Sequence, residues 1–434
     1  MNTILVLCLI ALALSLDYSI GLITLQAYWS HVNGNSNMFG VIFGLYDGFV
    51  IFITPIVAWL LNKNYLKYKL VFIVGLSLNL IGNVIYSFAF ALDTWVLILL
   101  GRAISGIGAS ALPLLIMYVA FVMDNDSQRP AVGYIKYTAA LTRVLGPVLG
   151  TVLALIKTTN NIFNEYTVTG WIPAGICLIA LIVVCFWEED VPSPTLLPQD
   201  GNDNMDYVTI IKTFMPIIGL GFITTFIYWY FVGNGFVIAM YRFHAITNSH
   251  ELGNWYYSGI GAFILAFVLF YFFQNFMSGN IGLCASSAGL ILTTTFFLCN
   301  IHVIFHFAVG LTTFCYAVLV PSINIQNNLL ARKNKELLGN IAGISIVSLA
   351  IFQSVARFVG PACFMLFKNV TESAECNMTD PEYYNVSDCR IDGYIPSSIG
   401  FISGSSLITM ICLFYTVKIG ISKMVPENNT VQPI

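Results

Sequence analysis

The residues best suited to chemistry in this sequence are charged side chains that fall inside long apolar stretches. They are two acids and four bases: Asp17, Asp47, Arg102, Lys136, Arg143 and Arg357. Burying a charge is costly, so such a residue either pairs with an opposite charge or has a function. We expect Asp17 or Asp47 to form an ion pair with Arg102. That pair could be structural, or one carboxylate could carry a proton, a role for which Asp17 is slightly favoured.

Arg143 and Arg357 have no obvious acidic partner, and their surroundings repeat. Each precedes a Gly-Pro pair, in "RVLGP" and "RFVGP", which indicates two homologous halves. Two guanidinium groups that face each other across a cavity could hold an anion through bidentate hydrogen bonds. The alternative is that each arginine bonds helix-end carbonyls, water or Asp47.

A third base and a glycine lie in register with Arg143. Lys136, Arg143 and Gly150 are spaced by seven residues, so on a helix they form one stripe. That stripe could guide an anion from the inner side of a membrane. We therefore predict that Arg143, Arg357 and Lys136 bind a small-molecule or inorganic anion.

The composition places these charges in a membrane protein. Of 434 residues, 58% are hydrophobic and 9% are charged, and the mean hydropathy is +0.82. A soluble chain of this length would lack the polar residues to cover its surface, so we expect the lipid bilayer as its environment. The net charge of -3 includes no basic tract, which argues against nucleic acid as a partner. No Walker loop, nucleophile elbow or metal-ligand cluster occurs, so we expect no enzyme, cofactor or metal site.

Twelve apolar segments are long enough for membrane helices, because a bilayer core about 30 Å thick needs roughly 20 residues. They span residues 4–29, 38–61, 70–92, 94–123, 132–156, 170–187, 211–240, 254–276, 281–299, 303–324, 338–367 and 396–417. This pattern predicts an all-α integral membrane fold of two pseudo-symmetric six-helix bundles. The bundles would comprise residues 1–187 and 208–434, joined by a cytoplasmic linker over 188–207 that is rich in Pro, Asp and Asn.

Basic residues in the connections indicate the orientation of the chain. If the N-terminus is cytoplasmic, most of these bases fall on the inner side, which the positive-inside rule favours. The inner set is Lys63, Lys67, Lys69, Arg129, Arg332, Lys333, Lys335, Lys418 and Lys423. Both termini are then cytoplasmic.

The same orientation places the long last connection, residues 368–394, on the outer side. It contains three glycosylation sequons, at Asn369, Asn377 and Asn385, so a glycoprotein is predicted. Cys376 and Cys389 lie in the same polar segment and could form a disulfide in an oxidising lumen or remain free thiols.

Two glycine-containing motifs resemble those of the major facilitator superfamily. In the fourth span, "GRAISGIGAS" is similar to an Arg-x-x-x-Gly-x-Gly motif through Arg102, Gly106 and Gly108. In the fifth span, "LGPVLG" resembles that family's Gly-Pro antiporter motif. The residues that match it are Gly146, Pro147 and Gly150, and Gly360 and Pro361 repeat the Gly-Pro pair in the second half.

The Gly-Pro segments are expected to serve as hinges or as close packing contacts, because small residues let helices approach and proline removes a backbone donor. One motif departs from the family pattern. The connection after the second span reads "AWLLNK", with Ala58 for glycine, Asn62 for the acid and Lys63 for arginine. The resemblance assigns that acid to an ion-pair latch, so Asn62 puts the latch in doubt.

The resemblance implies alternating access of two six-helix bundles around a central site. We therefore hypothesise secondary active transport of a small anionic solute, coupled to protons as a symporter or antiporter. The alternatives are a passive anion uniporter or channel, and a membrane scaffold that does not transport. The sequon-bearing loop and the arginines before Gly-Pro look most like lysosomal and endomembrane facilitators, so a membrane of the eukaryotic secretory pathway, or the plasma membrane, is expected.

Overall fold

The structure is a computed structural model of the whole chain. It describes residues 2–21, 24–34, 39–123, 125–153, 158, 160–188, 207–231, 261–262, 264–269, 271–273, 280–296, 302–333, 348–349, 351–353, 355–356, 370–371, 390–391, 407–412 and 414–415. Within these ranges, six helices are long and apolar enough to cross a membrane.

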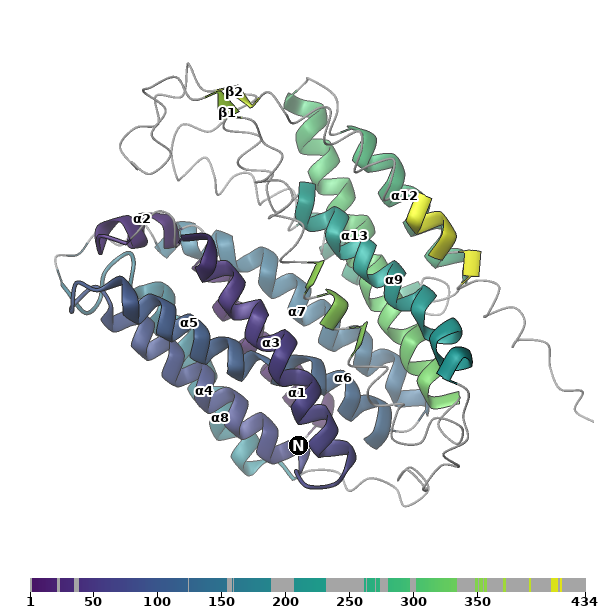
Figure 1. The fold of residues 1–434 in the computed structure, drawn as a ribbon, viewed down its shortest axis with the longest axis horizontal. Helices are drawn as coiled ribbons and strands as arrows, with labels where there is room; N and C mark the ends of the chain where they lie inside the picture. Colours follow the sequence, from purple (N-terminus) through teal and green to yellow (C-terminus); the bar gives the residue numbers. More distant parts are fainter. Residues whose placement is uncertain are drawn as a thin grey trace, which may run out of the picture.

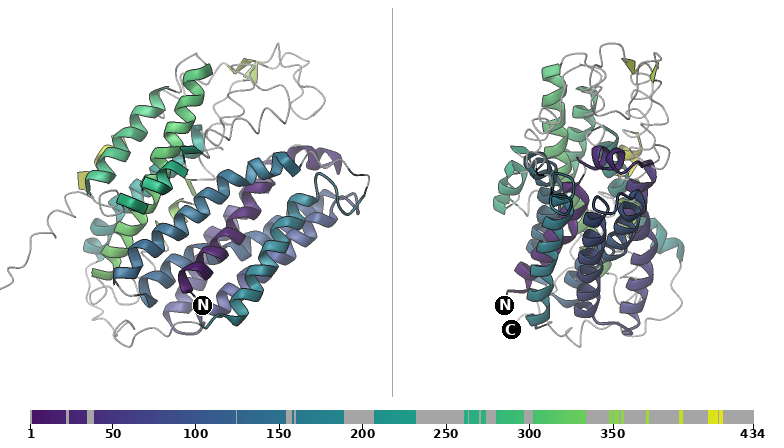
Figure 2. Two further views of the ribbon diagram at one scale, coloured as in Figure 1. Left: turned by 180° about the vertical axis from the view of Figure 1, so that it is seen from behind. Right: turned by 90° about the vertical axis from the view of Figure 1, so that its left-hand side faces the viewer.

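The N-terminal helices lie side by side in one bundle, and the C-terminal helices lie beside it (Figures 1 and 2). The first bundle contains α1 (Thr3–Ile20), α2 (Leu25–His31), α3 (Phe39–Asn62), α4 (Tyr68–Phe88), α5 (Trp95–Ala109), α6 (Ala111–Val122), α7 (Asn125–Leu153) and α8 (Val168–Phe186). The second part contains α9 (Tyr207–Phe231), α12 (Asn280–Phe296) and α13 (His302–Lys333), and two short strands, β1 (Val370–Thr371) and β2 (Arg390–Ile391).

Helix α4 illustrates how the sequence sorts residues between protein and lipid. Its buried face carries polar side chains, among them Asn79, Asn83 and Ser87. Its other face exposes Leu70 and Ile81, each 49% accessible. Apolar residues outside and polar residues inside suit a helix in lipid, where buried polar groups need partners within the protein.

Paired glycines let α4 and α5 approach closely. A Cβ on Gly101 would lie 2.7 Å from the Gly82 carbonyl oxygen, and a Cβ on Gly82 would lie 2.6 Å from the Gly101 carbonyl oxygen. One heptad along, Gly75 and Gly108 face each other in the same way. Side chains at these four positions would separate the helices.

Two of the predicted spans are interrupted. The first does not run continuously to residue 29, because α1 ends at Ile20 and α2 begins at Leu25. The fourth is broken at Ser110 into α5 and α6. Pro113 has no N–H to donate to the preceding turn, which accounts for a break at this point. The Ser110 carbonyl accepts a hydrogen bond from Thr54 Oγ1 at 3.3 Å.

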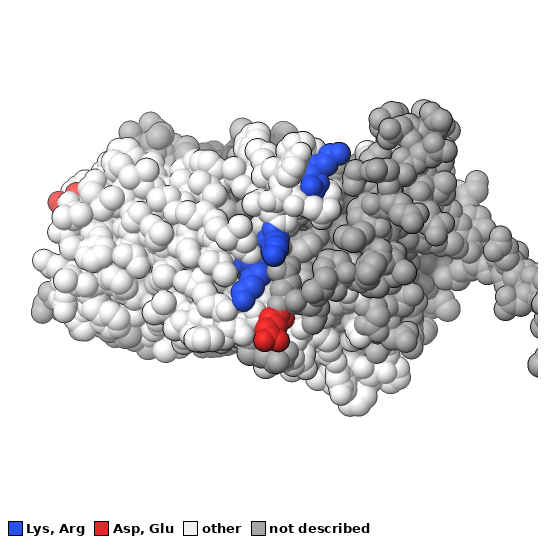
Figure 3. All heavy atoms as spheres, turned by 90° about the horizontal axis from the view of Figure 1, so that it is seen from below, with Lys and Arg blue, Asp and Glu red and all other residues white. Residues whose placement is uncertain are grey.

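The two ends of the molecule carry different features. The end seen from below shows a row of basic side chains (Figure 3). The α3–α4 connection and the first turn of α4, which contain Lys63, Lys67 and Lys69, lie at this end with the N-terminus. Strands β1 and β2 lie at the opposite end and pair antiparallel, with Thr371 opposite Arg390 (Figure 1).

Candidate functional site

A cavity with a volume of ≈ 70 Å³ lies between the two parts of the molecule. Helices α1, α3, α6 and α7 line it from the first bundle, and α9, α13 and Gln353 line it from the second part. The break between α5 and α6 falls at its wall, where Ala109 and Pro113 contribute. The cavity therefore lies where a relative movement of the two parts would change its access.

Two opposite charges line this cavity. Asp47 of α3 is 3% exposed, and Lys136 of α7 is partly exposed. A cation and a carboxylate at one small cavity can together bind an anion and a proton. Lys136, which the sequence analysis proposed as an anion ligand, thus lies on the cavity wall.

Aromatic rings form another part of the wall. Tyr18 and Tyr46 have ring centroids 5.2 Å apart, and Tyr46 Oη donates to the Leu14 carbonyl at 2.9 Å. Across the interface, the Tyr18 ring meets the Trp229 ring of α9 edge to face, with centroids 6.1 Å apart. Tyr316 of α13 lines the cavity from the second part.

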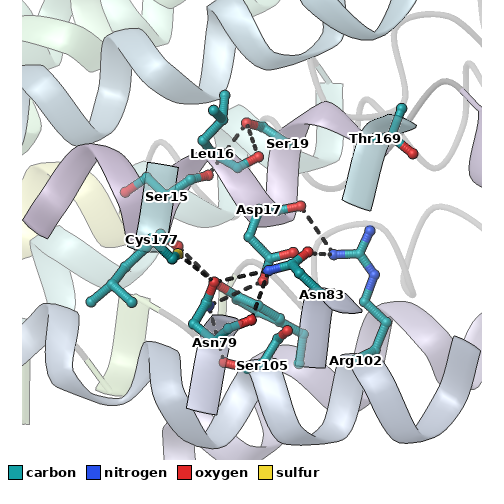
Figure 4. Close-up of polar contacts among 12 residues, drawn as sticks. Ser15, Leu16, Asp17, Ser19, Asn79, Asn83, Arg102, Ser105, Thr169 and Cys177 are labelled. Atoms are coloured by element: carbon teal, nitrogen blue, oxygen red, sulfur yellow. Dashed lines mark hydrogen bonds and ion pairs between the residues drawn. The ribbon is translucent and has the colours of Figure 1, made fainter. Parts of the chain in front are cut away.

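Asp17 contacts Arg102 inside the first bundle (Figure 4). Arg102 Nη1 lies 3.1 Å from Asp17 Oδ1 and also donates to the Asp17 backbone carbonyl at 3.0 Å. That carbonyl is in the last turn of α1, and the Gly21 N–H bonds to Ser19 instead of reaching it. Arg102 therefore satisfies both a carboxylate and an end-of-helix carbonyl, a favourable place for a cation.

A chain of amides surrounds this ion pair. Asn79 Nδ2 donates to Asp17 Oδ2 at 3.1 Å, and Asn83 Nδ2 donates to Asn79 Oδ1 at 2.9 Å (Figure 4). Cys177 Sγ of α8 donates to the same Asn79 oxygen at 3.1 Å. The Arg102 guanidinium also lies over the Tyr86 ring, 4.9 Å from its centroid. The network around Asp17 thus joins four helices of one bundle, α1, α4, α5 and α8.

The structure separates the two candidate carboxylates. Asp17 is 1% exposed and points into the first bundle, whereas Asp47 lines the cavity between the two parts. Sequence reasoning ranked Asp17 slightly ahead as a proton carrier. Of the two, only Asp47 lies on the cavity wall, where a solute could reach it.

The remaining predicted anion ligands are only partly placed. Arg143 belongs to α7, two helical turns beyond Lys136, and its side chain lies outside the described residues. Arg357, Gly360 and Pro361 also lie outside the described residues. The same holds for the loop asparagines and cysteines at Asn369, Asn377, Asn385, Cys376 and Cys389.

The motif glycines that are described lie at packing contacts within the first bundle. Gly146 of α7 packs directly against Ser19 of α1, whose hydroxyl donates to the Thr142 carbonyl at 3.1 Å. A Cβ on Gly106 would lie 2.7 Å from the Tyr46 carbonyl oxygen. Gly108 faces Gly75 in α4. Pro147 and Gly150 are buried in α7.

Sequence reasoning missed several polar residues of these sites. Asn79 and Asn83 are four apart and so lie on one face of an apolar helix. That spacing could have predicted that they contact a buried polar group such as Asp17. Ser15 and Gln353 line the cavity, but a single Ser or Gln in an apolar span gives no comparable signal.

The sequence profile of the Major Facilitator Superfamily matches residues 6–361. The match covers most of the chain, and the protein belongs to this family of membrane transporters. Two uncharacterized MFS-type transporters of Schizosaccharomyces pombe are 24% identical over 202 residues and 26% identical over 192 residues. Those matches cover 44% and 41% of this chain, and only 40% and 36% of the two relatives.

Solved transporters share the fold over nearly the whole chain. FucP in the outward conformation has a TM-score of 0.70 at 14% identity, covering 96% of this chain and 99% of its own. The human organic anion transporter MFSD10 (TETRAN) has a TM-score of 0.65 at 15% identity, covering 95% and 98%. These likenesses confirm the predicted all-α, twelve-helix membrane fold, and the protein is a multi-pass membrane protein.

Proposed function

We propose that this protein is a secondary transporter that moves a small anionic solute together with a proton by alternating access. The observation that carries the proposal is the cavity between the two parts, lined by Lys136 and Asp47. The two halves proposed to rock about it are residues 1–187 and 208–434, connected by the linker over 188–207.

Coupling follows from placing both charges at one cavity. An ionised Asp47 repels an anion that approaches Lys136, and protonation of Asp47 removes this repulsion. The anion therefore binds best when a proton is also bound, and the two are released together. Such linkage makes a proton gradient able to drive accumulation of the solute.

The substrate class rests on the residues of the cavity. Among proteins with this fold, FucP is described as a fucose:proton symporter and MFSD10 as an organic anion transporter. The fold thus serves both neutral and anionic solutes, and Lys136 is the feature that favours an anion here. Arg143 and Arg357 are proposed to extend the basic site from α7 and from the matching place in the second half.

A passive anion uniporter or channel is a second candidate. Asn62 stands where the family motif has an acid, and a weaker latch would loosen strict alternation. Trans-stimulation separates the candidates: a carrier exchanges faster when solute is present on both sides, and a channel carries current without this effect. A non-transporting scaffold would do neither.

We also propose that both termini are cytoplasmic and that the loop 368–394 faces a lumen of the secretory pathway or the cell exterior. The basic α3–α4 connection lies at the end of the molecule that carries the N-terminus, and β1 and β2 lie at the other end. β1 belongs to the Asn369 sequon, and β2 follows the other two sequons. This arrangement agrees with the positive-inside rule.

The test of coupling uses the full chain in proteoliposomes with an imposed pH gradient and a panel of labelled small anions. The wild type is expected to accumulate at least one anion against its gradient. Asp47→Asn should lose this accumulation and keep exchange, because exchange requires no net proton movement. Gradient-driven accumulation at the wild-type level in Asp47→Asn would remove Asp47 from the proposal.

A further inference from the structure

Two buried polar groups on the cavity wall lack partners among the described residues. They are the Ser15 hydroxyl on α1, in a residue 2% exposed, and the Gln353 side-chain amide Nε2, in a residue 7% exposed. Ser15 belongs to the first bundle and Gln353 to the second part, and both line the same cavity. An unsatisfied buried polar group is unfavourable, so a bound molecule that pairs with it gains affinity.

The chemistry of these groups defines their ligand. The Gln353 Nε2 group can only donate hydrogen bonds, and a serine hydroxyl can donate or accept one. Lys136, at the same cavity, also only donates. A ligand suited to this set therefore presents several acceptor oxygens, of which at least one is anionic.

The cavity also limits the size of the ligand. Its volume of ≈ 70 Å³ corresponds to about five to seven water-sized positions, since one water needs roughly 10–15 Å³ measured in this way. A three-carbon acid with one additional oxygen has a similar number of non-hydrogen atoms. The aromatic rings of Tyr18 and Tyr46 provide an apolar wall for its short carbon chain.

We infer that Ser15 and Gln353 form a neutral subsite for an oxygen atom next to the carboxylate, and that the preferred substrates are small 2-hydroxy or 2-oxo monocarboxylates. This inference rests on the proposed transport of an anion. Lys136 holds the carboxylate, and the subsite distinguishes an acid that carries the second oxygen from one that lacks it. Because the subsite has one member on each side of the interface, ligand binding links the two parts.

The test measures competition against labelled lactate bound to the purified full-length protein, with unlabelled lactate, propionate and lactamide as competitors. Propionate lacks the 2-hydroxyl group, and lactamide lacks the charge. Lactate should compete at least about tenfold better than propionate, the factor expected for losing a hydrogen bond to a buried group. Equal competition by propionate, or no lactate binding at all, would overturn the subsite.

The lactamide arm tests the proposed function separately. Competition by lactamide as strong as that by lactate would contradict an anion site and leave the neutral subsite standing. Weak competition by lactamide is the expected result.

Variants assign the preference to the two residues. Gln353→Leu and Ser15→Ala should each bring the ratio of lactate affinity to propionate affinity closer to one. Propionate affinity should stay within about twofold of the wild-type value, which also shows that each variant is folded. Ser287→Ala is the matched control, because Ser287 is buried and likewise without a hydrogen-bond partner among the described residues, but does not line the cavity. An unchanged preference in both cavity variants would contradict the inference.

Discussion

The two buried acids of the first bundle differ in what surrounds them, and on this basis we propose different roles for them. Asp17 is bonded to Arg102 and Asn79 on neighbouring helices, so its charge is compensated in place. Asp47 lines a cavity together with Lys136. A carboxylate paired with a buried cation inside one bundle stabilises that bundle, and one on a cavity wall can be reached by protons from water and solute.

Asp17→Asn should therefore reduce stability more than Asp47→Asn. Removing the charge of Asp17 leaves the buried guanidinium of Arg102 without its counterion, and breaking a buried pair in this way typically costs about 3–5 kcal/mol. Thermal unfolding of the two detergent-purified variants, followed by tryptophan fluorescence, measures the difference. Equal midpoints for the two variants would contradict a structural role for Asp17.

At this scale the sequence predicted part of the site. The cost of burying Arg102 indicated an acidic partner, and both candidate acids were identified. The choice between them depends on the rotation of α1 and α3 about their own axes, which an apolar sequence specifies poorly because both faces of each helix are hydrophobic. Gln353 was not predicted as a cavity residue, because its position on the cavity wall depends only on how its segment packs against the other helices.

Among the helices of the first bundle, α4 and α5 approach each other closely through glycines. Gly82 and Gly101 face each other through backbone atoms, and Gly75 and Gly108 repeat the contact one heptad away. Because lipid supplies no hydrophobic force between helices, such close contact is a main source of helix association in a membrane.

Gly101→Ala should destabilise the protein, whereas Gly175→Ala should not. The new methyl at position 101 would lie 2.7 Å from the Gly82 carbonyl oxygen, and nothing lies within 4 Å of the corresponding position at Gly175 in α8. We expect a loss of about 1–3 kcal/mol for the first variant. The second should be neutral or stabilised by up to about 1 kcal/mol.

Thermal unfolding of both alanine variants in the same detergent provides the comparison. Similar unfolding temperatures would show that the α4–α5 contact can relax around a methyl group and would contradict this account of the packing.

The positions of helices were more predictable than their interruptions. Length and hydropathy located the six apolar spans found among the described residues, and "GRAISGIGAS" indicated a helix with small residues. The break at Ser110 was not predicted, because proline and glycine are common in continuous membrane helices and their effect depends on the neighbouring helices. Here Thr54 provides a hydrogen bond to the Ser110 carbonyl.

For the whole molecule, the class of fold was predictable from composition, the twelve apolar segments, the repeated Arg-x-x-Gly-Pro segment and the resemblance to the major facilitator superfamily. Each half must bury its polar face against helices of the same bundle, and the cavity arises where the two halves meet. The solute itself was not predictable, because it depends on a few side chains brought together from distant parts of the chain.

The orientation of the whole molecule leads to a prediction about glycosylation. Asn369, Asn377 or Asn385 should carry glycan, because their loop contains β1 and β2, which lie opposite the basic end. Asn125 and Asn428, which also match the sequon, should not, because the proposed topology places them on the cytoplasmic side. Glycosidase treatment of the protein expressed in eukaryotic cells should shift its electrophoretic mobility. A shift that persists after all three loop asparagines are replaced would contradict the proposed topology.

The most direct test of the central proposal is counterflow in proteoliposomes with labelled acetate, lactate and succinate. If the wild-type protein is a carrier that binds an anion at Lys136, at least one labelled anion should transiently exceed its equilibrium level inside proteoliposomes loaded with the same unlabelled anion. Lys136→Gln should lose this overshoot, although the variant inserts into the membrane normally. Anion current without trans-stimulation, or no wild-type flux of any anion, would contradict secondary anion transport by this protein.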